Sequence, residues 1–445
     1  METRIPNSNG TERLGEILSD FAVNPAALVR LPSRRLCASR AVFMVLLAFV
    51  FVFLQPSTHA QNPAPSAPPH TDPLNLDPAV QDAFQHFYNL DYEGALNRFR
   101  LVMAQHPNDP MAVDYVLQTT LFRELHNLDL LDTTLYAHDG FLTSKRLANE
   151  DPEVRASIMA LIDQAISLSN MRLQANPNDK NALFTRGYAR SMNAAYIGMV
   201  DHSFVSGLHK ALQARSDHDR VLQLDPLYAD AKMVVGIHLF AVASLPGPLR
   251  FMAGIAGLGG SKSRGLQDLE DAAAHGVITN VESKTVLALF LRHDGRYQEA
   301  IAWTRQLTEE YPHDYLFRLE EANLTKDEGQ GVQAIALYRA VLADARKKDY
   351  FADPRLQLAW FGLAETLRGQ NDLQGAAEAY LKAAAQPKCS DWLRRRAELN
   401  AGEMFDLIHD RQQATQQYLL AVGGGGDPSQ AEAAKKYLKT PYVGH

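Results

Sequence analysis

A pattern of small and aromatic residues recurs along this chain with a period of about 34 residues, and it is the strongest constraint on the fold. Ala300 and Ala334 are one period of 34 apart, whereas Ala334 and Ala376 are 42 apart. The eight extra residues are expected in the charged stretch 345–354. The aligned positions are Tyr92, Ala95, Phe99 and Pro107; Gly295, Tyr297, Ala300, Leu307 and Pro312; Gly329, Ala334, Tyr338 and Val341; Leu373, Ala376, Tyr380 and Ala383; and, more weakly, Gly402, Ala414, Tyr418 and Ala421.

Each copy resembles a tetratricopeptide repeat. In that family a small residue opens the turn between two helices, an alanine lies where the helices touch, and an aromatic packs behind it. Trp360, Leu363 and Ala364 also fit the family's large-large-small positions in the first helix. The resemblance implies an all-α fold, an α-solenoid of helix-turn-helix repeats forming a curved superhelix, because one hairpin cannot bury its apolar face alone. The alternative is an unrelated helical protein with chance matches.

The chain divides into six predicted segments. No run alternates with period two, so no sheet is predicted. The last helix is expected to begin with Asp427 as N-cap and Pro428 at the first helical position. The segments are a signal peptide with a long leader (1–60), a proline-rich linker (61–75), a first repeat (76–109), an irregular helical region of degenerate repeats (110–280), a C-terminal repeat array (281–425) and a capping helix with a tail (426–445).

The N-terminal segment is typical of an export signal. Residues 41–54 are an unbroken apolar run of 14, preceded by arginines and followed by a small-residue site at Ala60 and Gln61. Fourteen helical residues span about 21 Å, less than the roughly 30 Å hydrocarbon layer. We therefore expect cleavage near Ala60/Gln61 and a periplasmic or extracellular protein, with an uncleaved anchor at 41–54 as the alternative.

Charge and cysteine content exclude several classes. The net charge is −7, and the first 60 residues carry six Arg against four Asp and Glu, so the remainder is −9. An acidic body argues against nucleic-acid binding. Cys37 lies in the segment expected to be removed, which leaves Cys389 alone and excludes a disulfide scaffold.

The middle of the chain departs from the repeat. We expect a loop with short helices at 126–150 and one long helical segment at 193–224. Residues 233–260 are apolar with a single charge, Arg250, and are interrupted by prolines. The stretch from about 230 to 290 faintly resembles the tetratricopeptide repeat protein 39 family, which implies an interaction or membrane-adjacent role. Residues 233–260 are either buried between repeats or an apolar lip that contacts lipid or a partner.

No motif nominates catalytic residues, a cofactor or a metal site. The glycines at 254–260 with Lys262 do not match a phosphate loop and follow no strand. His202 and His209 would lie about 10 Å apart on one helix, too far to share an ion. The possible ligands around them are Asp201, Asp217, His218 and Asp219.

The likeliest site is a protein- or peptide-binding face. In tetratricopeptide proteins the first helix of each repeat lines the concave side and contacts ligands. The paired Lys/Arg–Asn clamp of chaperone-binding relatives is missing here. By that resemblance the partner-binding residues are Phe184, Tyr188, Thr285, Leu289, Arg292, Leu319, Asn323, Lys326, Phe361, Glu365 and Arg368.

Three functions therefore compete. The first is a non-enzymatic exported scaffold that binds a protein or peptide in envelope assembly, secretion or transport. The second is a periplasmic protein that handles a solute or hydrophobic ligand and accompanies a transporter, with 110–280 closing a pocket. The third, an enzyme, would need a compact Asp/His cluster around 201–219.

Overall fold

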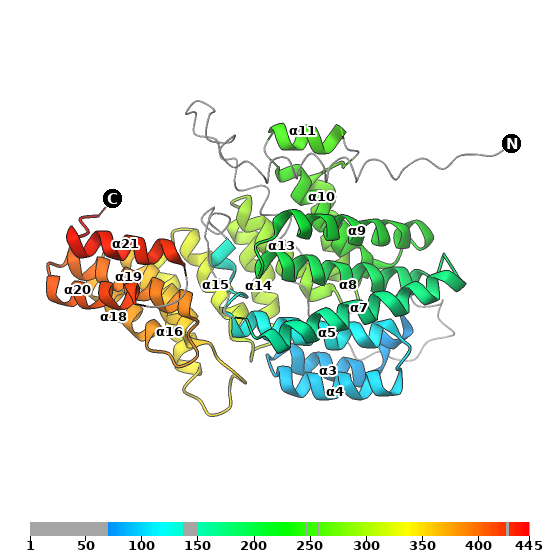
Figure 1. Cartoon of the computed structure of the whole chain (residues 1–445), viewed down its shortest axis with the longest axis horizontal. Helices are drawn as coiled ribbons and strands as arrows, with labels where there is room; N and C mark the ends of the chain where they lie inside the picture. Colours follow the sequence, from blue (N-terminus) through cyan, green and yellow to red (C-terminus); the bar gives the residue numbers. More distant parts are fainter. Residues whose placement is uncertain (1–69, 137–149, 246, 256–257, 424–426, 445) are drawn as a thin grey trace. The chain divides into compact units, whose positions relative to one another are not determined.

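The computed structural model describes residues 70–136, 150–245, 247–255, 258–423 and 427–444, and within these ranges it is helical without a strand (Figure 1). The all-α prediction is therefore confirmed. The predicted signal peptide and most of the linker lie outside the described residues. The chain forms two compact units, one from residues up to 82 with 97–121 and 156–287, the other from 83–96, 122–155 and 288–445.

The first unit is built around helix pairs that approach closely. Gly236 and Gly265 lie where two of its helices cross, and a Cβ added at either one would come within 2.7 Å of the other's carbonyl oxygen. Its elements are η2 (Pro73–Leu76), parts of α3 (Pro78–Tyr88), α4 (Tyr92–Gln105), α5 (Pro110–Asn127), α7 (Pro152–Ala175) and α13 (Asn280–His293), and all of α8 (Lys180–Met199), α9 (Phe204–Leu224), α10 (Ala229–Ser244), α11 (Gly247–Ile255) and α12 (Lys262–His275).

The expected single helix across 193–224 is wrong. α8 ends at Met199 and α9 begins at Phe204, with Asp201 and His202 in the connection. His202 has a positive φ of 51°, which no right-handed helix accommodates. The apolar periodicity continues across the break, which is why the sequence pattern hides it.

The apolar stretch 233–260 divides between two environments. α10 is buried from Ala229 to Val242 apart from Lys232 and Leu239. In α11, by contrast, Phe251 is 71% exposed and Arg250 is also exposed. Burial between helices therefore holds for α10, and the exposed-lip alternative stays open for α11.

The second unit contains a regular array of helix hairpins. Positive φ angles recur in its turns, at Gly295 and Gly329 and then at Asn371 and His409. Glycine and asparagine adopt this conformation most easily, so the small residues of the repeat pattern mark these turns. The array elements are α14 (Tyr297–Glu310), α15 (Tyr315–Asp327), α16 (Gly331–Asp344), α17 (Leu356–Gly369), α18 (Leu373–Ala384), α19 (Asp391–Leu407), α20 (Arg411–Val422) and α21 (Pro428–Lys439), with η3 (Thr133–Tyr136) before α7.

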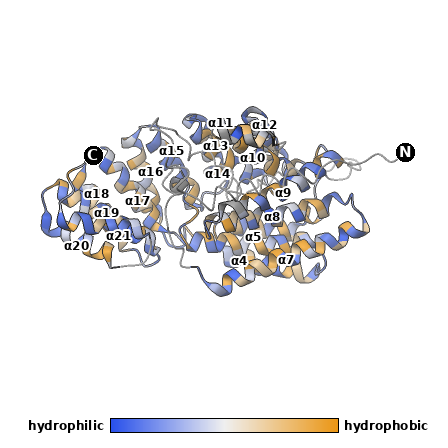
Figure 2. Ribbon diagram, turned by 45° about the horizontal axis from the view of Figure 1, so that its top comes forward, coloured by the Kyte–Doolittle hydropathy of each residue, from blue (hydrophilic) through white to orange (hydrophobic). Residues whose placement is uncertain are grey.

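Tyrosines of the second helix in each hairpin form the core of the array. Tyr338, Tyr380 and Tyr418 are fully buried. A Cβ at Gly362 would lie 2.5 Å from the Tyr338 ring, and a Cβ at Gly402 equally close to Tyr418. Apolar positions are concentrated between helices and hydrophilic ones on their outer faces (Figure 2). The repeat period thus reports a repeated packing contact.

Two predicted details of the array are confirmed. Residues 345–355 interrupt it between α16 and α17 without an α-helix. In α21, the Asp427 carboxylate accepts a hydrogen bond from the Ser429 N–H, and Pro428 occupies the first turn. Both follow from local turn and capping chemistry.

Candidate functional site

The first helices of the array hold a segment of the chain's own backbone. The indole Nε1 of Trp392 donates a hydrogen bond to the Leu128 carbonyl at 3.2 Å. The Asp129 carboxylate accepts from Gln357 Nε2 at 2.7 Å and from the Ser390 N–H at 2.9 Å. The residues following α5 are therefore fixed by polar groups from α17 and α19 and the turn between α18 and α19.

The same segment continues onto α13 and α15. Thr133 donates to Glu320 and accepts from Arg292 at 2.9 Å, while Asn323 donates to Asp132 at 3.4 Å. We call residues 126–133 the cis segment. The inner wall is the face of α13, α15, α17 and α19 that contacts it, and its contact residues are Arg292, Tyr315, Glu320, Asn323, Gln357 and Trp392.

An ion network stabilises this part of the wall. Arg292 is buried and lies 3.4 Å from Glu320 and 2.8 Å from Asp327. Burial lowers the pKa of Arg292, but these two carboxylates outweigh it and the pKa is raised. Burial raises the pKa of Glu320, and Arg292 opposes that rise. A buried arginine with two carboxylates is costly to disrupt from one side, because the remaining charges lose their partner.

The predicted partner-binding residues divide by accessibility. Phe184 stacks on His218, and the Tyr188 hydroxyl lies 3.4 Å from Gln118, so both are core residues of the first unit. Four predicted residues are half-buried and accessible: Thr285, Lys326, Glu365 and Arg368. Seven are buried: Phe184, Tyr188, Leu289, Arg292, Leu319, Asn323 and Phe361.

Three of the accessible residues lie in the array. Arg368 is 3.5 Å from Glu403 and donates to the Tyr442 hydroxyl at 3.1 Å. Glu365 accepts from Asn400 at 3.1 Å. Lys326 is 3.6 Å from Asp327 and is only 20% exposed. These groups already have partners of opposite charge or polarity, so a ligand would compete with local contacts.

Sequence reasoning missed the cis segment and most residues that hold it. Asp129, Gln357, Glu320 and Trp392 carried no motif, and the contacts join positions 159 to 264 residues apart. A buried Asp in a loop needs donors, but the burial of Asp129 cannot be read from the sequence. The backbone of Asp129 also adopts the left-handed conformation, with a φ of 57°.

The Asp/His group at 201–219 is not a compact cluster. The Asp217 carboxylate pairs with Arg186 and Arg190, each at 2.6 Å. Both ring nitrogens of His218 lack a hydrogen-bond partner in the described chain, and burial lowers the pKa of His218 to about 3. Across the described ranges no group of three or more His, Cys, Asp or Glu side chains could hold a metal ion.

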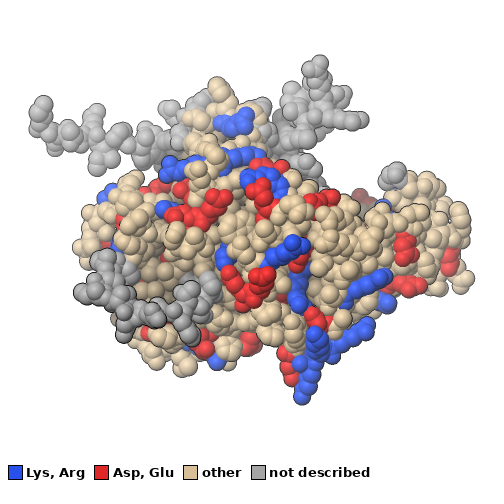
Figure 3. All heavy atoms as spheres, turned by 180° about the vertical axis from the view of Figure 1, so that it is seen from behind, with Lys and Arg blue, Asp and Glu red and all other residues tan. Residues whose placement is uncertain are grey.

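Surface charge is mixed on the face shown in Figure 3, where acidic and basic side chains are interspersed. Basic side chains gather only locally on that face. A duplex-binding protein usually presents a broad basic surface. Separately, none of the described helices has both the length and the apolar composition needed to cross a bilayer.

The geometry defines a class of protein, an all-helical hairpin-repeat protein whose first helices hold a segment of its own chain. Residues 319–391 match the tetratricopeptide repeat family, a range that begins in α15 and ends at the start of α19. The similarity to tetratricopeptide repeats is shown for this region of the chain. No curated protein is significantly similar in sequence.

Solved structures resemble the chain only at low identity. A tetratricopeptide repeat protein from Parabacteroides merdae is 14% identical, with a TM-score of 0.33 over 73% of this chain and 99% of that one. Yeast Tom70 is 11% identical, with a TM-score of 0.39 over 83% and 95%. YrrB, described as having an unusual peptide-binding site, is 15% identical, with a TM-score of 0.32 over 56% and 96%. No function is carried over from any of them.

Proposed function

We propose that this protein is a non-enzymatic, exported scaffold that binds a protein or peptide partner on the inner wall of its C-terminal array. One observation carries the proposal. The wall already holds a segment of the chain itself, the cis segment, through bonds to a backbone carbonyl and to short polar side chains. Backbone carbonyls and short polar side chains are groups that a partner peptide also offers, so the wall has donors and acceptors suited to binding one.

A partner would meet first the accessible part of the wall. Lys326, Glu365 and Arg368 present one carboxylate and two cations there. Arg292 and Asn323 would become available only where the cis segment is displaced. Charge reversal at Arg292 would therefore test folding, whereas reversal at Arg368 tests binding.

Site-specific photocrosslinking in intact cells tests the binding face. A photoreactive residue replaces Lys326 or Arg368, and Lys435 on α21, which is exposed, serves as the matched control. We expect the same partner to be captured from positions 326 and 368 and not from 435. Identical products from position 435, or no product from either wall position, would refute the wall as the binding face.

Export is supported by the apolar run at 41–54 and its basic flank. We expect the N-terminus of the protein recovered from the envelope to be Gln61, as measured by N-terminal sequencing. A full-length chain in the membrane fraction would favour the anchor, and a full-length chain in the cytosol would contradict export. A role in envelope assembly, secretion or transport depends on this result.

A second candidate, solute binding, has one observation in its favour in the first unit. Asp114 is fully buried, and neither carboxylate oxygen has a hydrogen-bond partner in the described chain. The same holds for the Gln118 side-chain nitrogen. Burial raises the pKa of Asp114. Unpartnered buried polar groups cost about 1–3 kcal/mol each, and a bound amine or amide would supply the missing partners.

Native mass spectrometry of gently purified protein tests this candidate. We expect a bound mass that is absent after denaturation and is lost in Asp114→Leu. If the untreated protein has the mass of the unliganded chain, solute binding is excluded. Lys435→Gln is the surface control, and it should keep the bound mass. If a protein partner is captured and no small molecule is bound, only the scaffold function remains.

A further inference from the structure

A groove opens on another side of the array from the inner wall. It lies between α16 and α18 with α17 as its floor and has a volume of about 390 Å³. Trp360, Leu363 and Leu367 line it, spaced by three and four residues on one face of α17. Phe361, on the inner-wall side, belongs to a different face of that helix.

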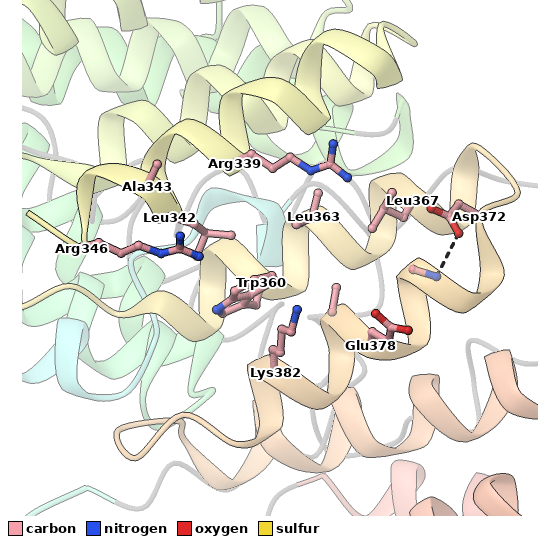
Figure 4. Close-up of a pocket in the computed structure, with 12 residues that line it drawn as sticks. Arg339, Leu342, Ala343, Arg346, Trp360, Leu363, Leu367, Asp372, Glu378 and Lys382 are labelled. Carbon is pink, nitrogen blue, oxygen red and sulfur yellow. Dashed lines mark hydrogen bonds between the residues drawn. The ribbon is translucent and has the colours of Figure 1, made fainter.

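Three cations line the groove around Trp360. The Lys382 ammonium lies 4.6 Å from the ring centroid. Arg346 extends from the α16 side and Lys382 from the α18 side, with Trp360 between them, whereas Arg339 lies farther along α16, above Leu363 (Figure 4). All three basic side chains are exposed at the groove. Their charges and the indole face together make a site for an anion beside an apolar group.

These cations differ from several other basic residues of the array. Arg292, Arg305 and Arg318 each pair with a carboxylate. Arg339, Arg346 and Lys382, in contrast, pair with no carboxylate within the described ranges of the chain. Isolated exposed cations are ordinary, but two that flank one half-buried indole in a groove, with a third along the same groove, are not explained by solvation.

The two acidic residues of the groove have local partners. Asp372 accepts from the Gly375 N–H at 2.9 Å as the N-cap of α18, and Glu378 accepts from Gln374 at 2.9 Å. They lie away from Arg346 in Figure 4. The groove therefore carries acidic as well as basic side chains along its length. A polyanion such as RNA would meet repulsion along it, whereas a short segment with a few carboxylates would not.

We propose that this groove docks an acidic linear segment of a partner protein, with an apolar side chain over Trp360 and carboxylates on Arg346, Lys382 and Arg339. The inference rests on the scaffold function and adds a second contact site to it. The apolar side chain replaces the Lys382 ammonium over the indole. The freed ammonium then pairs with a carboxylate of the segment.

Fluorescence anisotropy with labelled decapeptides tests the proposal on the chain from residue 61 to 445. The probes are an acidic peptide of alternating Glu and Leu, the same peptide with Gln for Glu, the same with Lys for Glu, and a ten-nucleotide polyuridine. We expect only the acidic peptide to bind, and its affinity should fall as the salt concentration rises, because salt screens exposed charges. Tighter binding of polyuridine, or equal binding of the Gln peptide, would overturn the proposal.

Variants locate the site. The double variant Arg346→Gln/Lys382→Gln should lower the affinity for the acidic peptide by about tenfold or more. The double variant Lys347→Gln/Lys435→Gln is the charge-matched control. All four positions are exposed, so folding is unaffected. Equal losses in both pairs would overturn the assignment. If positions 326 and 368 give no crosslinks while the acidic peptide still binds, the inner wall is rejected as a binding face and the groove is retained. If those positions crosslink a partner while the acidic peptide does not bind, the groove is rejected and the inner wall is retained.

Discussion

Removing the Asp129 carboxylate should release the cis segment at a measurable cost in stability. The side chain is fully buried, accepts two hydrogen bonds and lies 3.6 Å from Arg355. Asp129→Ala leaves the Ser390 N–H without its acceptor. Gln357 and Arg355 keep one bond each to the Lys388 carbonyl, which limits the loss.

The expected loss follows from these contacts. Two hydrogen bonds to a charged acceptor contribute roughly 1.5–3 kcal/mol each. Burial raises the pKa of Asp129, so part of that gain offsets the cost of desolvating the carboxylate. The net loss is therefore about 3 kcal/mol, near the lower limit for breaking a buried pair. Placing alanine at φ 57° adds about 1 kcal/mol.

Asp349 provides a matched control. It has almost the same backbone conformation, φ 55°, but its side chain is 85% exposed. Asp349→Ala therefore incurs only the backbone cost. Urea unfolding monitored by circular dichroism gives both free energies of unfolding by linear extrapolation. A difference below 1 kcal/mol between the two variants would refute the view that the carboxylate anchors the segment.

Three further outcomes follow from the packing and the pKa shifts. Gly265→Ala should lower the free energy of unfolding by about 1–3 kcal/mol in a urea titration, because the Gly236 carbonyl oxygen cannot move aside; a stabilised variant would contradict this crossing. His218 is neutral when folded, with its pKa lowered to about 3, so the unfolded state binds the extra proton and stability falls as pH drops below 6.5. His218→Phe should remove about 2 kcal/mol of the loss between pH 7.5 and 5, and equal pH dependence of both proteins would refute it. Burial raises the pKa of Cys389 to about 12, so mass spectrometry should find it unalkylated by iodoacetamide at pH 8 until urea is added; rapid labelling of the native protein would show that it is accessible.

Local physics made the hairpins predictable from sequence. The spacing of Ala334, Tyr338 and Ala376 reports contacts between neighbouring helices, and Gly295 and Gly329 report a turn with positive φ. The same physics explains the missed break at 200–203. The apolar period continues through it, and only the φ of His202 interrupts the helix.

The inner wall was only partly predictable, because its occupant is distant in sequence. The family resemblance placed Arg292 and Asn323 among the ligand-contacting positions, and in the structure both bond to the cis segment. These contacts are to the chain's own cis segment, and contact of either residue with a partner stays a prediction. Nothing within a helix period could indicate that residues 126–133 would lie there.

The cis segment and a partner peptide would compete for the inner wall, and this competition can be measured. If displacing the segment costs about 3 kcal/mol, the apparent affinity of a competing peptide falls by a factor of about 150. Asp129→Ala removes that cost and should tighten partner binding in titration calorimetry, while Asp349→Ala should leave it unchanged. Weaker partner binding to Asp129→Ala would instead mean that the cis segment forms part of the partner's binding site, because the wall would then bind the partner only with the cis segment in place.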